Sequence, residues 1–148
     1  MHSDEHSPYA GRQVITASWV GNALFAVSAA PAAAGVDAFD IPAIAVALLL
    51  FLAGIVVWVA AYVRAVVRNV NGEAVTVPRM FLWQGNVPRA VTWQLYGSLA
   101  VCILIVAGTA SAEPFGTLVP MYPLGLVGLW GARYGTFPPR TDLNPRRR

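Results

Sequence analysis

The stretch IPAIAVALLLFLAGIVVWVAAYV, residues 41–63, decides the fold, because it carries no charged side chain over the length of a membrane crossing. As an α-helix it would be about 34 Å long, and the hydrocarbon core of a bilayer is about 30 Å thick. Each of its valine, isoleucine, leucine and phenylalanine side chains favours insertion by about 0.3–0.6 kcal/mol near the bilayer centre. The stretch therefore predicts a transmembrane helix.

The composition of the whole chain agrees with this prediction. Of its 148 residues, 57 % are hydrophobic and 11 % are charged, whereas soluble domains carry about 25 % charged residues. The net charge of +3 is too small and too dispersed for a nucleic-acid surface, so we expect no nucleic-acid partner. The single cysteine, Cys102, has no partner for an internal disulfide, and we expect it to be a small packing residue.

Three further apolar runs extend the pattern to four spans. They are residues 14–34, 92–112 and 115–132. The last run is short and is interrupted by Pro120 and Pro123, which a bundle tolerates because neighbouring helices satisfy the freed carbonyl groups. We therefore predict an all-α fold, a polytopic four-helix transmembrane bundle that forms one domain over residues 14–134.

The first run, residues 14–34, has two interpretations. It is either a retained transmembrane helix, with Asn22 facing a neighbouring helix, or a cleavable signal peptide, because its apolar core precedes several alanine-rich sites. A signal peptide requires a positively charged leader, whereas Arg12 is opposed here by Asp4 and Glu5. We therefore favour the retained helix.

The arginines predict the orientation of the bundle. Arg12, the arginines of residues 64–91 and those from Arg133 onward fall on one side of the membrane when both termini lie on that side. Because basic residues are enriched in cytoplasmic segments, we expect both termini in the cytoplasm. The polar residues 1–13 are expected to be a disordered tail, and the proline-rich, basic residues 135–148 are expected to be an extended or disordered tail.

The cytoplasmic loop, residues 64–91, contains two further patterns. Asn71 and Gly72 precede an alternating stretch, residues 73–77, which predicts a small hairpin. The apolar patch MFLW, residues 80–83, is too short to cross a bilayer and either enters the membrane interface or packs on the end of the bundle.

This loop is also our candidate for contact with a partner. It concentrates aromatic residues among arginines, and both residue types are enriched at interaction hot spots. We expect the partner to be another membrane protein or anionic lipid. The residues predicted for this contact are Arg64, Arg68, Arg79, Phe81, Trp83 and Arg89.

Small residues recur at helical spacing in two of the runs. They repeat every seven positions in residues 41–63 and in steps of three and four from residue 125 onward. Small side chains let helix backbones approach closely, either within the bundle or at an interface with another protein. The predicted helix-packing residues are Ala47, Gly54, Ala61, Gly125, Gly128, Ala132 and Gly135.

No pattern indicates a reaction. An ionisable side chain inside the membrane usually marks a transport or catalytic site, but the acidic residues Asp37, Asp40 and Glu113 all fall at the ends of the runs. Both histidines, His2 and His6, lie far from any candidate nucleophile. We therefore predict no catalytic residue, metal site or cofactor, and we expect that the protein is not an enzyme.

Two function classes remain. We favour a non-catalytic accessory or interaction component of a membrane complex, because the arginine-rich loop has the composition of a contact surface. The alternative is a small channel or transporter that acts as a homo-oligomer, with Asn22, Ser98 and Thr109 lining a polar path. The sequence does not determine the oligomeric state.

The final run, FGTLVPMYPLGLVGLWGA, and the residues that follow it up to position 140 resemble uncharacterised small four-span integral membrane proteins of high-GC Gram-positive (actinobacterial) bacteria. The resemblance extends over most of the chain. It implies a location in the bacterial plasma membrane and implies no particular activity.

Overall fold

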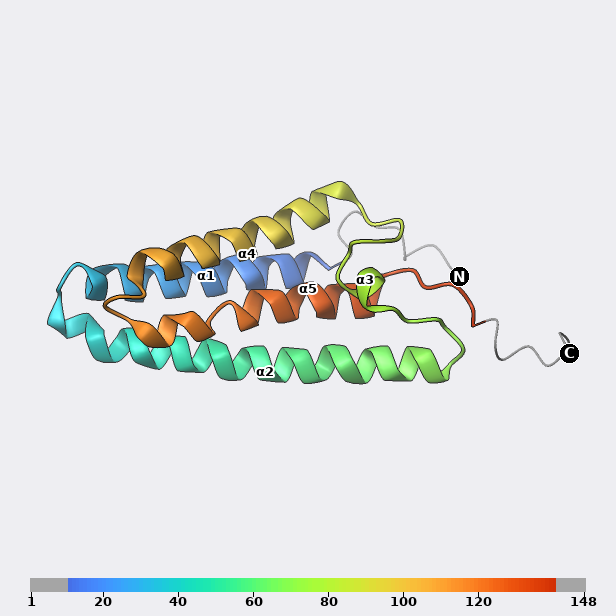
Figure 1. Ribbon diagram of the computed structural model, residues 1–148, viewed down its shortest axis with the longest axis horizontal. Helices are drawn as coiled ribbons and strands as arrows, with labels where there is room; N and C mark the ends of the chain where they lie inside the picture. The colour runs from blue at the N-terminus through green and yellow to red at the C-terminus, as the bar shows by residue number, and fades with distance from the viewer. Residues whose placement is uncertain (1–10, 141–148) are drawn as a thin grey trace, which may run out of the picture.

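The protein is a bundle of membrane-spanning helices, shown by a computed structural model that describes residues 11–140 (Figure 1). The long helices are α1 (Arg12–Ala33), α2 (Asp40–Val70), α4 (Arg89–Thr109) and α5 (Met121–Tyr134). The short ones are η1 (Asp37–Phe39), α3 (Val77–Met80) and η2 (Pro114–Leu118). Four segments are long and apolar enough to cross a membrane, η2 and α5 together forming the last. The predicted all-α four-helix bundle is confirmed, and the chain is a multi-pass membrane protein.

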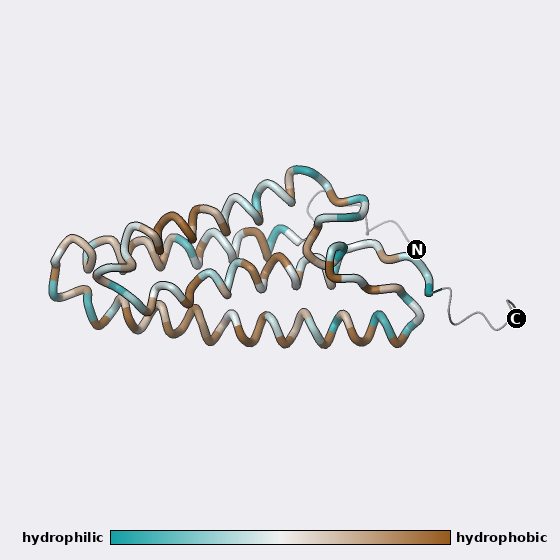
Figure 2. The backbone as a smooth tube through the Cα atoms, viewed as in Figure 1, coloured by the Kyte–Doolittle hydropathy of each residue, from teal (hydrophilic) through white to brown (hydrophobic). Residues whose placement is uncertain are grey.

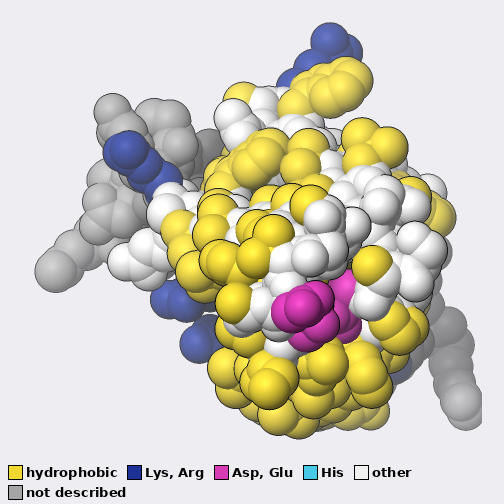
Figure 3. Space-filling view, turned by 90° about the vertical axis from the view of Figure 1, so that its left-hand side faces the viewer, with side chains coloured by type: hydrophobic (Ala, Val, Ile, Leu, Met, Phe, Trp, Pro, Cys, Tyr) yellow, Lys and Arg dark blue, Asp and Glu magenta, His cyan; other side chains and the backbone are white. Residues whose placement is uncertain are grey.

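Successive long helices run in opposite directions, which separates the charges between two ends of the bundle. We call one the arginine end, and its arginines are Arg12, Arg64, Arg68, Arg79, Arg89, Arg133 and Arg140. The opposite, acidic end contains Asp37, Asp40 and Glu113, and Figure 3 shows an acidic patch there within a hydrophobic surface. Between the two ends the helices are largely apolar (Figure 2).

The least hydrophobic span is the most buried one. Within residues 11–140, 56 % of the last span is buried inside the bundle, against 22 % of the strongly apolar α2. Figure 1 shows α5 lying between α1 and α2. Lipid solvates apolar side chains as well as protein does, so a bundle gains little by burying its most apolar helix. The span that decides the fold from sequence therefore lies mostly against lipid.

Glycines let α5 approach its neighbours closely. A Cβ atom added at Gly54 of α2 would lie 3.0 Å from the backbone nitrogen of Tyr122, and one at Gly21 of α1 would lie 2.9 Å from Tyr122 Cδ1 and closer still to Cε1. A Cβ atom at Gly125 of α5 would lie 2.9 Å from the Trp58 ring. Close van der Waals packing of this kind drives helix association in a membrane.

The last span is not the continuous kinked helix that the sequence predicts. It consists of the 3-10 helix η2, a turn at residues 119–120 and the α-helix α5. Pro120 is the N-cap of α5 and Pro123 lies in its first turn, where proline's missing N–H group has no helical acceptor to bind. The prolines thus begin a helix instead of bending one.

The predicted hairpin after Asn71 is wrong. Glu73 forms a single antiparallel bridge with Pro139, in which the Ala74 N–H donates to the Pro138 carbonyl at 2.7 Å and the Arg140 N–H donates to the Gly72 carbonyl at 2.7 Å. Residues 135–140 therefore lie against the loop and are not part of a disordered tail. Residues 1–10 and 141–148, where the remaining tail predictions fall, lie outside the described residues.

Candidate interaction surface

A buried polar cluster joins α1 to α4. The hydroxyl oxygens of Ser18 and Ser98 lie 2.5 Å apart, and Asn22 Nδ2 donates to the Ser98 carbonyl oxygen at 2.6 Å and to Ser98 Oγ at 3.0 Å. All three side chains are buried, and Asn22 Oδ1 has no protein partner. Hydrogen bonds across membrane helices contribute about 0.6 kcal/mol each. The cluster therefore stabilises the contact between α1 and α4 and fixes their register.

The three residues predicted to line a polar path do not lie together. Asn22 and Ser98 belong to the cluster, whereas the hydroxyl of Thr109 donates to the Ile105 carbonyl of its own helix at 2.9 Å. The two surface grooves described below include none of these residues. The hydrogen bonds between Asn22 and Ser98 make these two residues a link between α1 and α4.

The predicted helix-packing residues all lie on buried faces. This holds on α2 for Ala47, Gly54 and Ala61, and at the C-terminal part of the chain for Gly125, Gly128, Ala132 and Gly135. Their contacts differ in tightness, however. Gly54 and Gly125 meet α5 and Trp58 closely, whereas a Cβ atom at Gly128 would lie 3.7 Å from Met80 Cε, an ordinary van der Waals distance.

The tightest glycine contact with another segment is one that the sequence analysis missed. A Cβ atom at Gly131 would lie 2.6 Å from the carbonyl carbon of Met80 and closer still to its carbonyl oxygen. The partner is the backbone of α3, which has no recognisable small-residue pattern facing Gly131. The spacing of small residues therefore contains no signal for this contact.

The apolar patch MFLW packs on the end of the bundle over most of its length. The Met80 backbone lies against Gly131, the Phe81 ring centroid lies 5.7 Å from that of Trp58, and Leu82 is buried. Leu82 has a positive φ of 61°, an uncommon conformation for leucine that costs on the order of 1–3 kcal/mol. Of the two alternatives, packing on the bundle describes the first three residues, and only Trp83 points outward.

Arg68, one of the predicted contact residues, is engaged inside the chain. Its guanidinium group donates to Glu73 Oε2 at 2.7 Å and to the Ala132 carbonyl at 3.1 Å, and it lies 4.7 Å from the Phe137 ring centroid. These contacts tie α2, the loop and α5 together. Arg68 is therefore removed from the contact surface, while Arg64 and Arg89 remain exposed and Arg79 is half-buried.

Two exposed tryptophans flank the start of α4. Trp83 is 74 % exposed and Trp93 is 77 % exposed. The Trp83 Nε1 group donates to the Tyr96 hydroxyl at 2.8 Å, and that hydroxyl donates to the Phe81 carbonyl at 2.6 Å. Trp83 is thus held in one orientation although most of its ring is outside the bundle.

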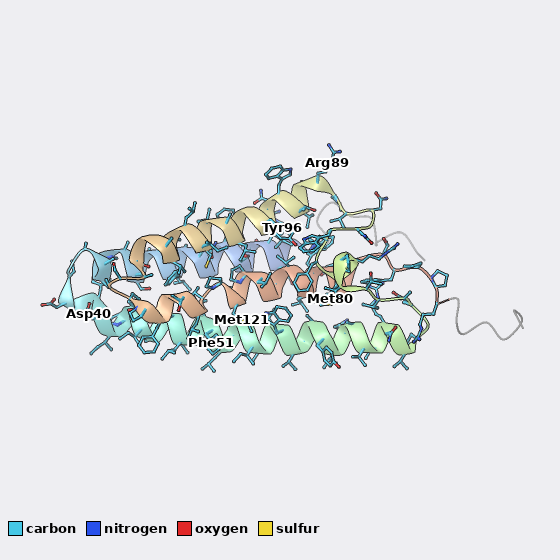
Figure 4. All side chains as sticks on the ribbon, viewed as in Figure 1. Asp40, Phe51, Met80, Arg89, Tyr96 and Met121 are labelled. Carbon is cyan, nitrogen blue, oxygen red and sulfur yellow. The ribbon has the colours of Figure 1, made fainter. Side chains whose placement is uncertain are left out.

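A groove of about 510 Å³ lies beside these rings. It is lined by Leu82, Gly85, Val87, Arg89, Thr92 and Trp93. Figure 4 shows the Arg89 side chain extending away from the bundle, and Tyr96 lying below it on the same helix. We call Trp83 together with this groove the tryptophan surface.

The acidic end contains one buried carboxyl group. Glu113 is 3 % exposed, and its Oε1 atom has no hydrogen-bond partner. Burial raises the pKa of Glu113, the nearby charge of Asp40 raises it further, and the Phe115 backbone N–H, which binds the carboxylate, opposes the shift. Within residues 11–140 no group of three metal-ligating side chains surrounds it.

Scans of the chain against protein-family models, curated proteins and solved structures found no match. The class that the fold defines is that of a multi-pass membrane protein with four spans.

Proposed function

We propose that the protein is a non-catalytic component of a complex in the bacterial plasma membrane, with both termini in the cytoplasm, and that it binds a partner protein through the tryptophan surface. The observation that carries the proposal is the fixed orientation of the largely exposed Trp83. Tryptophan is among the residues most enriched at binding hot spots, and a side chain ordered before binding loses less conformational entropy on association.

The hydrogen bonding of Trp83 favours a protein contact over a simple position in the interfacial belt. Tryptophans in such a belt place the ring among headgroups, where the indole N–H meets water or lipid. The Trp83 N–H instead binds Tyr96 within the chain, which leaves the ring carbons as the exposed surface. Arg89 adds a cation beside the groove, so the partner is expected to present an apolar side chain next to a carboxylate.

The orientation follows from the arginine end. Seven arginines of the described chain lie there, and Asp37, Asp40 and Glu113 lie at the other end. The positive-inside bias therefore supports a cytoplasmic arginine end. Reporter fusions at Gly72 and at the C-terminus are expected to report cytoplasm, and an external signal from either fusion would contradict this orientation.

The test of the proposal is the composition of the native particle. The tagged chain is solubilised mildly, and the mass and protein content of the particle are measured. We expect a reproducible second protein that is lost from the double variant Trp83→Ala, Trp93→Ala and retained by Tyr62→Ala. Tyr62 is a matched control because it is an exposed aromatic residue on α2, far along the sequence from the tryptophan surface.

Two outcomes would contradict the proposal. A monomer with no partner in the parent chain would remove the interaction itself. A homo-oligomer that conducts ions in liposomes would favour the channel or transporter alternative instead.

A further inference from the structure

A second groove lies between α1 and α5, at the arginine end of the bundle. Its volume is about 570 Å³, within the range of about 300–1,000 Å³ typical of ligand sites. It is lined by Arg12, Gln13, Thr16, Ala17, Val20 and Tyr122. It shares no residue with the tryptophan surface, so an assignment here is independent of the function proposed above.

The floor of the groove is the Tyr122 ring. Gly21 lets this ring lie against α1, because a Cβ atom there would be 2.9 Å from Tyr122 Cδ1. The Tyr122 hydroxyl donates to the Ala17 carbonyl at 3.2 Å. Since its polar atom is already bonded within the bundle, Tyr122 presents mainly ring carbon to the groove.

The lining changes from charged to apolar along α1. Arg12 begins the helix, Gln13 and Thr16 follow with polar groups, and Val20 lies two turns further on. Arg12 and Val20 are about 12 Å apart along the helix axis. Because Arg12 lies at the arginine end and α1 crosses the membrane, the groove runs from the headgroup level into the acyl-chain region.

The charge of the groove is unbalanced. Within residues 11–140 no lining residue is acidic, and the ion pair found there joins Arg68 to Glu73 and does not involve Arg12. Arginine binds phosphate oxygens with several N–H donors at once. A ligand that complements this groove has an anionic phosphate at one end and a hydrocarbon chain at the other.

We propose that the α1–α5 groove binds one anionic phospholipid from the leaflet at the arginine end, with its phosphate on Arg12 and an acyl chain against Val20 and Tyr122. Gln13 and Thr16 lie at the level of the glycerol and ester groups, where their side chains serve as hydrogen-bond partners. The site differs from a general attraction of arginines for the membrane surface because it holds one lipid in a defined position.

The experiment uses the full-length chain in phosphatidylcholine vesicles that contain a small fraction of phosphatidylglycerol with a photoactivatable acyl chain. After illumination, the labelled peptides are identified by mass spectrometry. We expect the label on residues 12–20 and around Tyr122, and better competition by unlabelled phosphatidylglycerol than by phosphatidylcholine. One arginine near a membrane surface contributes about 1 kcal/mol, so Arg12→Gln should lower this labelling about fivefold.

Two further variants separate the site from nonspecific effects. Arg64→Gln removes an exposed arginine at the same end that lines neither groove, and should leave labelling of the groove unchanged. Val20→Trp, at an exposed position, should fill the groove and exclude the acyl chain while Arg12 keeps its charge. Arg12→Gln and Val20→Trp together test the two halves of the lipid contact, phosphate and chain, by substitution at exposed positions.

Four results would overturn the proposal. Labelling that falls equally in Arg12→Gln and Arg64→Gln would show general electrostatic attraction. Labelling spread evenly over the lipid-facing side of α2 would show that no defined site exists. A groove peptide that stays unlabelled in every vesicle would show that another segment or a second copy covers it. Loss of labelling in excess inorganic phosphate would assign the site to free phosphate.

Discussion

The substitution Gly131→Ala tests the tightest interhelical contact in the bundle. The added methyl group would lie 2.6 Å from the Met80 carbonyl carbon, whereas carbon atoms pack best at about 3.5–4.0 Å. Because the Met80 carbonyl oxygen lies closer still to the methyl group, the α3 backbone would have to move away from α5 by more than about 1 Å. This movement is costly because the atoms that must shift belong to a backbone and not to a flexible side chain.

The magnitude follows from two opposing terms. Inserting a methylene-sized group into a packed interior typically costs about 1–3 kcal/mol, and a backbone contact belongs at the upper end of this range. Replacing glycine by alanine within a helix returns up to about 1 kcal/mol. We expect Gly131→Ala to lower the free energy of unfolding by about 2 kcal/mol.

Two other glycines provide matched controls. A methyl group at Gly128 meets Met80 Cε at 3.7 Å, and one at Gly97 of α4 meets no atom within 4 Å. Neither substitution requires the backbone to move. Both variants should therefore be as stable as the parent, or more stable by the helix-propensity term of up to about 1 kcal/mol.

The assay uses the single cysteine as a reporter. Cys102 is buried, so a thiol-reactive dye labels it only when the bundle opens. In detergent, the labelling midpoint of Gly131→Ala should fall by about 4–8 °C relative to the parent, at about 2–4 °C for each kcal/mol. A variant that melts with the parent would refute the argument from close contact, and so would a Gly128→Ala protein that melts as low as Gly131→Ala.

Two further predictions concern the polar groups. Because burial raises the pKa of Glu113 in the fold, the folded state holds a proton more tightly than the unfolded state does. The free energy of unfolding should therefore fall as the pH rises from the unfolded pKa near 4.5 to the folded pKa. Thermal melts of Glu113→Gln should lack this dependence on pH. Ser98→Ala removes the hydroxyl that binds Ser18 and Asn22, leaving only the bond from Asn22 to the Ser98 carbonyl, and should cost about 1–2 kcal/mol in the cysteine assay, whereas Ser28→Ala, which loses bonds only within its own helix, should cost little.

The spans could be predicted from sequence because insertion depends on a local property, the apolar content of about 20 consecutive residues. Residues 41–63 lie within α2, which continues past Arg64 and Arg68 and ends at Val70. The predicted helix boundaries are less accurate where prolines occur. The sequence predicts one kinked helix over residues 115–132, yet Pro120 begins a new helix after η2. Whether proline bends a helix or begins one depends on the backbone angles available to the preceding residues.

The contacts of the arginine end could not be predicted in the same way, because each joins segments distant in sequence. In the sequence, Arg68 has the pattern of a surface arginine. In the fold, however, it contacts Glu73, Ala132 and Phe137. The groove between α1 and α5 depends on Tyr122 lying against Gly21, about a hundred residues earlier in the chain. Sequence patterns within one helix contain no information about such pairs.

The interior position of the last span still has a local signature. In water, the most apolar helix is the one expected inside a bundle, but in lipid burial of apolar side chains supplies little driving force. Interior position is then favoured by features that allow close contact, namely small side chains and an irregular backbone that needs neighbouring partners. The last span has both, with Gly125, Gly128 and Gly131 in α5 and prolines at its start. In a chain of this class, low hydropathy together with glycine and proline therefore predicts the central helix, and high hydropathy predicts the lipid-facing one.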